Sequence, residues 1–446
     1  MDNKLFTAFD LLMLPIYFFG IYYLAQMRIR GKAAANPIYR FYLKGLLAKM
    51  FGAIAVCFIY LFYYKGGDTI GYFESSILVT KLAVVDFETY LKIMSGDLSK
   101  LNLFQMVVNN LCCPDYYRDP QSFSVVRAVS PVVFLGSFSY LSTSLIFSYI
   151  SYAGIWRLFL LFNELYPNME NKFATAILYM PSLIFWGSGI LKDTITFSAV
   201  CLFTYSIYNT FIKKQKRGTN ILLLILSSFA LITVKPYIFV ALLPGAAIWL
   251  SFSRISSIKN GFVKIAITPV ILIVAFALTT TIMGALGSSL GSFSSVDSAL
   301  NKAVLTKNDL TRDAYGKNSF DIGSYDASLF GILSKFPAAV VAGLFRPFLW
   351  DVSNPVMLIS ALENTFLMLL TLRVLMRVGP INFFSLIFKE PLLIFSFVFA
   401  IFFSFSVGLT TANFGALVRY KIPALPFYLS TLLILENKIR VLRDSK

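Results

Sequence analysis

The residue best suited to chemistry in this sequence is an acidic residue on a glycine-rich turn. Asp68 lies in residues 65–71 (KGGDTIG), directly after the apolar run 51–64. A carboxylate held where an apolar helix meets water can hold a hydroxyl group or take its proton. Asp68 is therefore the candidate general base.

Further charged residues each stand next to the end of an apolar run. Lys and Arg in such places suit a phosphate or diphosphate, and Arg offers a bidentate fork. Charges at membrane depth are costly unless they are paired or solvated, so a set that shares one side of a membrane is a candidate site. Beside Asp68, this set contains Lys192, Asp193, Lys235, Arg346, Asp351 and Arg419. Glu363 falls inside an apolar run, where we expect a partner or a site role.

The absence of certain residue types limits the reactions that this chain can catalyse. The chain has no histidine, which excludes Ser-His-Asp and Cys-His catalysis and any His-bound zinc or haem. Its 4 cysteines include the adjacent pair Cys112 and Cys113, which can form a disulfide, but no Cys-x2-Cys pair. We therefore predict no metal ligands and no certain cofactor, and leave dependence on a divalent metal open.

Composition places the chain in a membrane. Hydrophobic residues make up 57% of the sequence and charged residues only 14%, values typical of a polytopic membrane protein. The formal net charge of +17 is concentrated in short loops, as the positive-inside rule expects, so we predict membrane lipid rather than nucleic acid as a partner. The first apolar run lacks a cleavage signal and is predicted to be a retained helix.

The predicted fold is all-α and polytopic, a single membrane domain over residues 1–446. About eleven apolar runs are long enough to cross a bilayer. Basic loops at 28–44, 213–217 and 438–446 put the N-terminus outside and the C-terminus in the cytoplasm. The predicted spans lie near 9–25, 46–64, 138–162, 173–186, 195–212, 221–233, 238–250, 265–286, 355–375, 392–407 and 422–435.

Two long extracytoplasmic loops are expected, and either could cover the candidate site. The first, 65–129, is too polar to span and contains amphipathic pieces near 70–82, 87–94 and 103–111. The second, 287–352, begins rich in Ser, Asn, Asp and Gly and becomes apolar after residue 328. Both are predicted to carry interfacial helices.

Short stretches of the sequence resemble the GT-C glycosyltransferases. Gly67-Asp68 and Tyr72-Phe73 resemble the acidic motif of the first loop in that family. Residues 419–426 (RYKIPALP) resemble the Arg-Tyr-x-x-Pro-x-x-Pro opening of a late helix in the protein-mannosyltransferase-like branch. Residues 181–194 are similar to a segment of bacterial envelope-polysaccharide members.

This resemblance implies a function, a donor and a location. Asp68 would be the general base on an acceptor hydroxyl, and a polyprenyl-phosphate sugar would be the donor. The phosphate and substrate contacts would come from Lys192, Lys235, Arg346, Arg419, Tyr72 and Tyr420. The chain would lie in the bacterial cytoplasmic (inner) membrane, with possible partners in an envelope-biosynthesis assembly.

The sequence departs from the family in one respect. Many members carry an acidic pair in the first loop, whereas Asp68 is followed here by Thr69. Glu74, Asp86 and Asp193 are candidates for a second carboxylate.

Structural roles compete with each of these assignments. Asp68 can be a turn or N-cap residue, and Lys192 and Asp193 can pair at the start of a helix. Lys235 can extend its side chain from a helix end, and Arg346 can anchor an interfacial helix on anionic lipid.

Other functions also stay open. An envelope polysaccharide polymerase or ligase shares the lipid diphosphate and the outer Arg. A transporter or flippase for a lipid-linked substrate is a different class, although paired broken helices in two matching halves are not evident. A scaffold within a membrane assembly is a further alternative.

The charge pattern makes a topological prediction. In a variant without the native cysteines, a cysteine placed at Lys100 should react with a membrane-impermeant maleimide added outside the cell. A cysteine at Lys214 should react only after the membrane is permeabilised, because its loop is basic. Strong labelling at Lys214 from outside would overturn the orientation.

Overall fold

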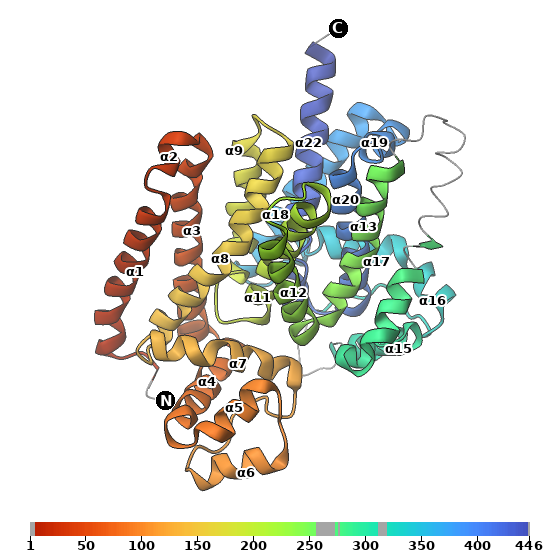
Figure 1. Ribbon diagram of the computed structural model, residues 1–446. Helices are drawn as coiled ribbons and strands as arrows, with labels where there is room; N and C mark the ends of the chain where they lie inside the picture. Colours follow the sequence, from red (N-terminus) through yellow and green to blue (C-terminus); the bar gives the residue numbers. More distant parts are fainter. Residues whose placement is uncertain (1–4, 256–272, 275–276, 311–318, 445–446) are drawn as a thin grey trace. The chain divides into compact units, whose positions relative to one another are not determined.

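The computed structural model describes residues 5–255, 273–274, 277–310 and 319–444. Within these ranges the chain forms helices joined by short turns, and its only extended pairing is an isolated bridge between Ser319 and Asn413 (Figure 1). The prediction of an all-α protein is confirmed for the described residues.

Among the described residues, 7 helices are long and apolar enough to cross a membrane. Each coincides with a predicted span. They are α1 (Ala8–Ile29), α3 (Arg40–Phe58) within Pro37–Tyr63, α8 (Tyr140–Leu165), α11 (Lys192–Ile207) within Lys192–Ile212, α12 (Arg217–Val234), α18 (Pro355–Val378) and α20 (Pro391–Thr410).

Within the described residues, the predicted spans 173–186, 238–250 and 422–435 do not meet this test. Residues 238–250 lie in α13 (Pro236–Ile255) and residues 422–435 lie largely in α22 (Leu425–Asp444). The predicted span 265–286 falls partly outside the described residues.

The predicted span 173–186 is not one continuous helix. It divides into α9 (Glu170–Phe173), the segment η3 (Ala174–Leu178) and α10 (Pro181–Trp186). Pro181 explains the break, because proline has no N–H to donate and disfavours helical backbone in the residue before it.

Segments of π-helix end the long helices α3 and α11 and follow the short helix α9. Residues Ile59–Tyr63 (η2), Ala174–Leu178 (η3) and Tyr208–Ile212 (η4) have this form. In each, the residue after the segment donates its N–H to the carbonyl of the segment's first residue, at 2.9 to 3.0 Å. Such turns carry one residue more than an α-helical turn and are frequent near functional sites.

The predicted first loop is a small helical layer. It contains α4 (Asp68–Val85), α5 (Phe87–Ser95), α6 (Lys100–Val108) and α7 (Pro120–Leu135). The side chains of Asp86, Ser99 and Asp119 accept backbone N–H bonds at the starts of α5, α6 and α7. The helix predicted at 103–111 therefore lies a few residues earlier.

The two halves of this layer differ in their surroundings. Phe73 and Val79 of α4 pack with Val126 and Val133 of α7 in a buried core, so α4 is not a purely surface helix. The shorter helices α5 and α6 keep several large apolar side chains exposed, as an interfacial helix would. These include Phe87, Leu91, Leu101 and Phe104.

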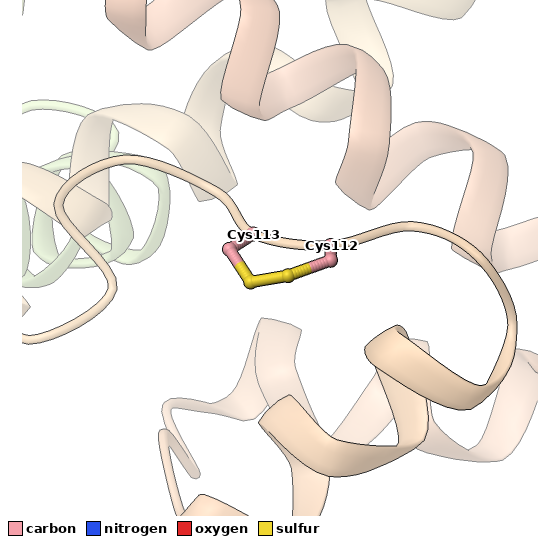
Figure 2. The surroundings of a disulfide bond; sticks show 2 residues. All are labelled: Cys112 and Cys113. Atoms are coloured by element: carbon pink, nitrogen blue, oxygen red, sulfur yellow. A yellow bond between two sulfur atoms is a disulfide. The ribbon is translucent and has the colours of Figure 1, made fainter.

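A disulfide lies in the loop between α6 and α7. It joins the adjacent residues Cys112 and Cys113, both of which are exposed (Figure 2). The side of the membrane on which this loop lies stays a prediction.

The predicted second loop is also mostly helical where it is described. Its elements are η5 (Gly287–Phe293), α15 (Val296–Leu310), α16 (Leu329–Ser334), α17 (Phe336–Phe345) and η7 (Leu349–Asp351). Shorter helices elsewhere are α2 (Lys32–Ala35), η1 (Pro37–Tyr39), α19 (Pro380–Ile387) and α21 (Phe414–Tyr420).

The chain divides into two compact units. Unit 1 contains Met1–Glu164, Leu183–Leu202 and Thr233–Lys235, and unit 2 contains Leu165–Ser182, Phe203–Ile232 and Pro236–Lys446. The core of unit 1 surrounds α4 and α7. In unit 2, α20 packs on α13, α17 and α22, with Phe395 and Phe399 against Phe427.

One face of α3 supports a segment of unit 1 that lies far along the sequence. Lys49, Gly52 and Val56 recur at helical spacing on this face. The ammonium of Lys49 donates to the carbonyl of Gly187. A Cβ at Gly52 would lie 2.0 Å from the carbonyl oxygen of Ile184, so only glycine permits this approach.

This contact gives a prediction about stability. Gly52→Ala should lower the unfolding temperature of the purified protein, because overpacking against fixed backbone costs about 1–3 kcal/mol. Gly20→Ala in α1 is the matched control, since nothing lies within 4 Å of a Cβ there. Equal unfolding temperatures for the two variants would contradict the close packing.

Candidate functional site

The turn before Asp68 depends on its glycines. Gly66 and Gly67 have φ angles of 148° and 111°, which favour glycine. They lead from η2 into α4, whose first residue is Asp68. A carboxylate at a helix N-terminus is favoured by the helix dipole. Thr69 then fixes the first turn of α4 through a 3.0 Å hydrogen bond with the hydroxyl of Tyr140.

Tyr116 contacts Asp68 from the loop before α7. Its hydroxyl donates to Oδ1 of Asp68 at 3.4 Å, and its ring lies 4.8 Å from that of Tyr72. Burial, followed by the charges of Asp68 and Asp115, raises the pKa of Tyr116 to about 12. Tyr116 therefore stays protonated near neutral pH and can orient the Asp68 carboxylate.

Tyr72, predicted to be a substrate contact, packs against the ring of Tyr116. It is almost fully buried, whereas Tyr116 is only partly buried. Tyr72 is placed to support Tyr116 through ring packing.

A second group of charged residues in unit 1 includes the start of α11. Lys192 begins this helix, and its Nζ lies 3.7 Å from Oδ2 of Asp119 at the start of α7. The Lys192 side chain is 21% exposed. It also interacts electrostatically with Lys235, Asp68 and Asp193. Unit 1 therefore brings the candidate base and two of the predicted cations into one neighbourhood.

Asp119 holds a fixed place beside Lys192. Its Oδ1 accepts the backbone N–H groups of Gln121 and Ser122, and its Oδ2 accepts the Ser122 hydroxyl. Burial alone would raise the pKa of the Asp119 carboxyl, but the Ser122 hydrogen bonds and the charge of Lys192 lower it below its ordinary value. Asp119 is therefore ionised near neutral pH.

Lys235 and Asp193 form a buried ion pair. Nζ of Lys235 donates to Oδ1 of Asp193, and the two side chains are 7% and 1% exposed. Burying such charges is expensive unless they neutralise each other. Asp193, considered as a second carboxylate, is thus committed to Lys235.

Glu74 and Asp115 lie close to the Asp68 turn. Partial burial and the neighbouring Asp115 carboxylate raise the pKa of Glu74. Oδ2 of Asp115 is within 3.3 Å of the place that a Cβ on Gly71 would occupy, one turn after Asp68. Within the described ranges, no three Asp, Glu or Cys side chains are grouped closely enough to hold a metal ion.

Arg346, another predicted phosphate ligand, belongs to unit 2. Its Nε lies 3.9 Å from Oδ2 of Asp351. Its guanidinium carbon lies 5.0 Å from the ring centre of Phe320 and 5.6 Å from that of Phe348. These contacts hold Arg346 by cation–π packing as well as by charge.

Arg419 and Tyr420 end the short helix α21, also in unit 2. Both are partly exposed, whereas the next residue, Lys421, is fully buried. Nζ of Lys421 donates to the carbonyls of Leu344 and Arg346 at 3.3 and 3.0 Å and to Asn364. Lys421 thereby joins the residues 419–426 to the end of α17.

The predicted site residues are therefore distributed over both units. Unit 1 contains Asp68, Tyr72, Glu74, Lys192, Asp193 and Lys235, and unit 2 contains Arg346, Arg419 and Tyr420. A single site that includes both groups stays a prediction.

Sequence reasoning missed several of the contacting residues. Tyr116 and Asp119 carry no motif, although Asp119-Pro120 is a helix-start signal. Lys49 was visible as a lone charge inside an apolar run, which is a marker of a buried partner. Lys421 lies within residues 419–426, but no role was predicted for it.

No protein-family model, curated protein or solved structure matches this chain.

The buried pair yields a prediction about stability. Asp193→Leu should lower the unfolding temperature strongly, because a buried ammonium left without its partner costs about 3–5 kcal/mol. Adding Lys235→Met should restore most of the loss, since the pair is then replaced by apolar side chains.

The exposed pair Glu88–Lys92 in the same unit is the control. Glu88→Gln should leave the unfolding temperature unchanged, because exposed pairs contribute little. A double variant no more stable than Asp193→Leu would show that the pair is not what stabilises this region.

Proposed function

We propose that this chain is an integral-membrane glycosyltransferase that moves a sugar from a polyprenyl-phosphate-linked donor to a hydroxyl of an envelope glycan, lipid or protein. The observation that supports it best is the ion pair of Lys192 with Asp119, at 3.7 Å, in a position where Lys192 also interacts electrostatically with Asp68. A carboxylate beside a partly exposed ammonium offers a proton acceptor and a phosphate ligand together.

Asp68 would act as the general base. It takes the proton of the acceptor hydroxyl as the oxygen attacks the anomeric carbon of the sugar. The bond from that carbon to the phosphate oxygen breaks, and the lipid phosphate leaves with the electron pair. A positioned base supplies about 10²- to 10⁴-fold in rate. The Tyr116 hydroxyl orients Asp68 for this step.

Lys192 would bind the departing phosphate directly. Its partner Asp119 holds the ammonium in place. The ion pair Lys235–Asp193 has no net charge, so it does not compete with Lys192 for the lipid phosphate. Arg346, Arg419 and Tyr420 stay predicted donor contacts, with Arg419 offering a bidentate fork. A leaving phosphate stabilised by cations needs no general acid.

The proposed location is the extracytoplasmic side of a bacterial cytoplasmic membrane, with the N-terminus outside. The exposed disulfide between Cys112 and Cys113 and the exposed apolar side chains of α5 and α6 support this placement.

The functional prediction concerns Asp68→Asn. This change keeps the size of the side chain but removes the proton acceptor, so transfer should fall by at least about 10²-fold. Binding of the lipid donor should persist. The measurement is sugar transfer and donor binding by the purified protein with a polyprenyl-phosphate sugar.

Further comparisons make this assay specific. Asp97→Asn, an exposed carboxylate in the same loop, should keep full transfer. Lys192→Ala and Arg419→Ala should weaken donor binding instead. A polyprenyl-diphosphate oligosaccharide as the preferred donor would indicate a polymerase or ligase, and lipid movement across proteoliposomes without transfer would indicate a flippase. Full transfer by Asp68→Asn would remove the proposed mechanism.

A further inference from the structure

Unit 2 contains a cavity that the proposed transfer reaction does not use. Its volume is about 320 Å³, within the range of small-ligand sites. The interrupted segment between α9 and α10, α18 and α22 all contribute to its wall. Its lining is apolar apart from a few side chains, and the residues that matter here are Tyr179, Pro181, Leu362, Glu363, Phe366 and Leu429.

Glu363 is the one charged side chain in this wall. It is 7% exposed. Its Oε2 accepts the backbone N–H of Ser182 at 2.9 Å, a donor that lacks a helical acceptor because α10 begins at Pro181. Among the described residues, Oε1 of Glu363 has no hydrogen-bond partner.

Tyr179 presents a second unsatisfied group. Its hydroxyl is buried, and it too has no partner within the described part of the chain. Buried polar atoms without partners are costly, and two of them belong to residues of this one wall. The carboxylate torsion of Glu363 is soft, so its free oxygen can turn toward a ligand.

The mouth of the cavity lies on an apolar face of α18. Ile359, Leu362 and Phe366 recur at helical spacing and are 53%, 55% and 50% exposed. Because α18 is long and apolar enough to cross a membrane, a face of this kind meets lipid rather than water. A ligand would therefore enter from the bilayer.

Charge selects the class of ligand. The Glu363 carboxylate repels a phosphate or a fatty acid. The buried Lys421 ammonium interacts electrostatically with Glu363 and disfavours a second cation. A neutral hydroxyl can donate to the Glu363 oxygen while it accepts from the Tyr179 hydroxyl.

We propose that this cavity binds a neutral membrane amphiphile, an apolar chain that ends in a hydroxyl, with Glu363 and Tyr179 as the two hydrogen-bonding partners of that hydroxyl. The site is separate from the proposed phosphate contacts and does not depend on glycosyl transfer.

The test uses the full chain purified into phosphatidylcholine nanodiscs. The probe is hexadecan-1-ol with a diazirine on its chain, and the comparisons are the same chain as an alkane and as a carboxylic acid. After illumination, the alcohol should label peptides from residues 175–181 or 359–366. It should compete about tenfold better than the alkane or the acid, as expected for one buried hydrogen-bonding group.

Variants decide which residues hold the hydroxyl. Glu363→Leu should reduce labelling by the alcohol about tenfold, and Glu363→Gln should retain most of it, because an amide still hydrogen-bonds. Tyr179→Phe removes only the hydroxyl and covers the case in which Glu363→Leu does not fold. Leu369→Ala, on the exposed side of the same helix, should change nothing.

Equal labelling by alcohol and alkane, or stronger labelling by the acid, would overturn the ligand class. Tyr179→Phe should likewise reduce labelling by the alcohol, and unchanged labelling in that variant, whether or not Glu363→Leu folds, would overturn the assignment of two partners to one hydroxyl. Retention in all these variants would overturn the site.

Discussion

The hydrogen bond from the Lys49 ammonium to the Gly187 carbonyl constrains the site in unit 1. Lys49 stands inside a helix long enough to cross a bilayer, where an unsatisfied charge is expensive. The bond holds residues 187–191 against α3, and Lys192 follows at once. The same helix leads through η2 to Asp68. The helix α3 thereby helps to position both the carboxylate and the ammonium of the candidate site.

The same requirement separates charges that are satisfied inside the fold from the candidate substrate contacts. Asp10 accepts the Ser139 hydroxyl, and Asp193 and Lys235 neutralise each other. Lys421 is surrounded by carbonyl and amide oxygens. These groups satisfy the interior and stabilise the fold. Lys192 and Arg346 differ because part of each side chain reaches the surface, and that exposure is what a substrate contact needs.

Sequence patterns predicted the features that depend on local composition. The apolar runs of α1, α8 and α20 were found because a crossing helix needs about 20 apolar residues. The place of Asp68 after a glycine turn followed from the same kind of evidence. The contacts of Asp68 with Tyr116 and of Lys192 with Asp119 join residues 48 and 73 positions apart, and no local pattern encodes such distances. Pro181 signals a helix break in the sequence, but residues 173–186 were predicted to form one span because the run is apolar.

The π-helical turns at η2, η3 and η4 have a consequence for comparing this chain with others. Each turn contains one residue more than an α-helical turn, so the chain leaves the helix rotated by about 100° relative to an α-helical end. A related protein without the extra residue would align correctly only if a one-residue gap were placed inside the apolar run. Gap penalties that protect helices would suppress that gap, and the motifs that begin at Asp68 and at Pro181 would then be read out of phase.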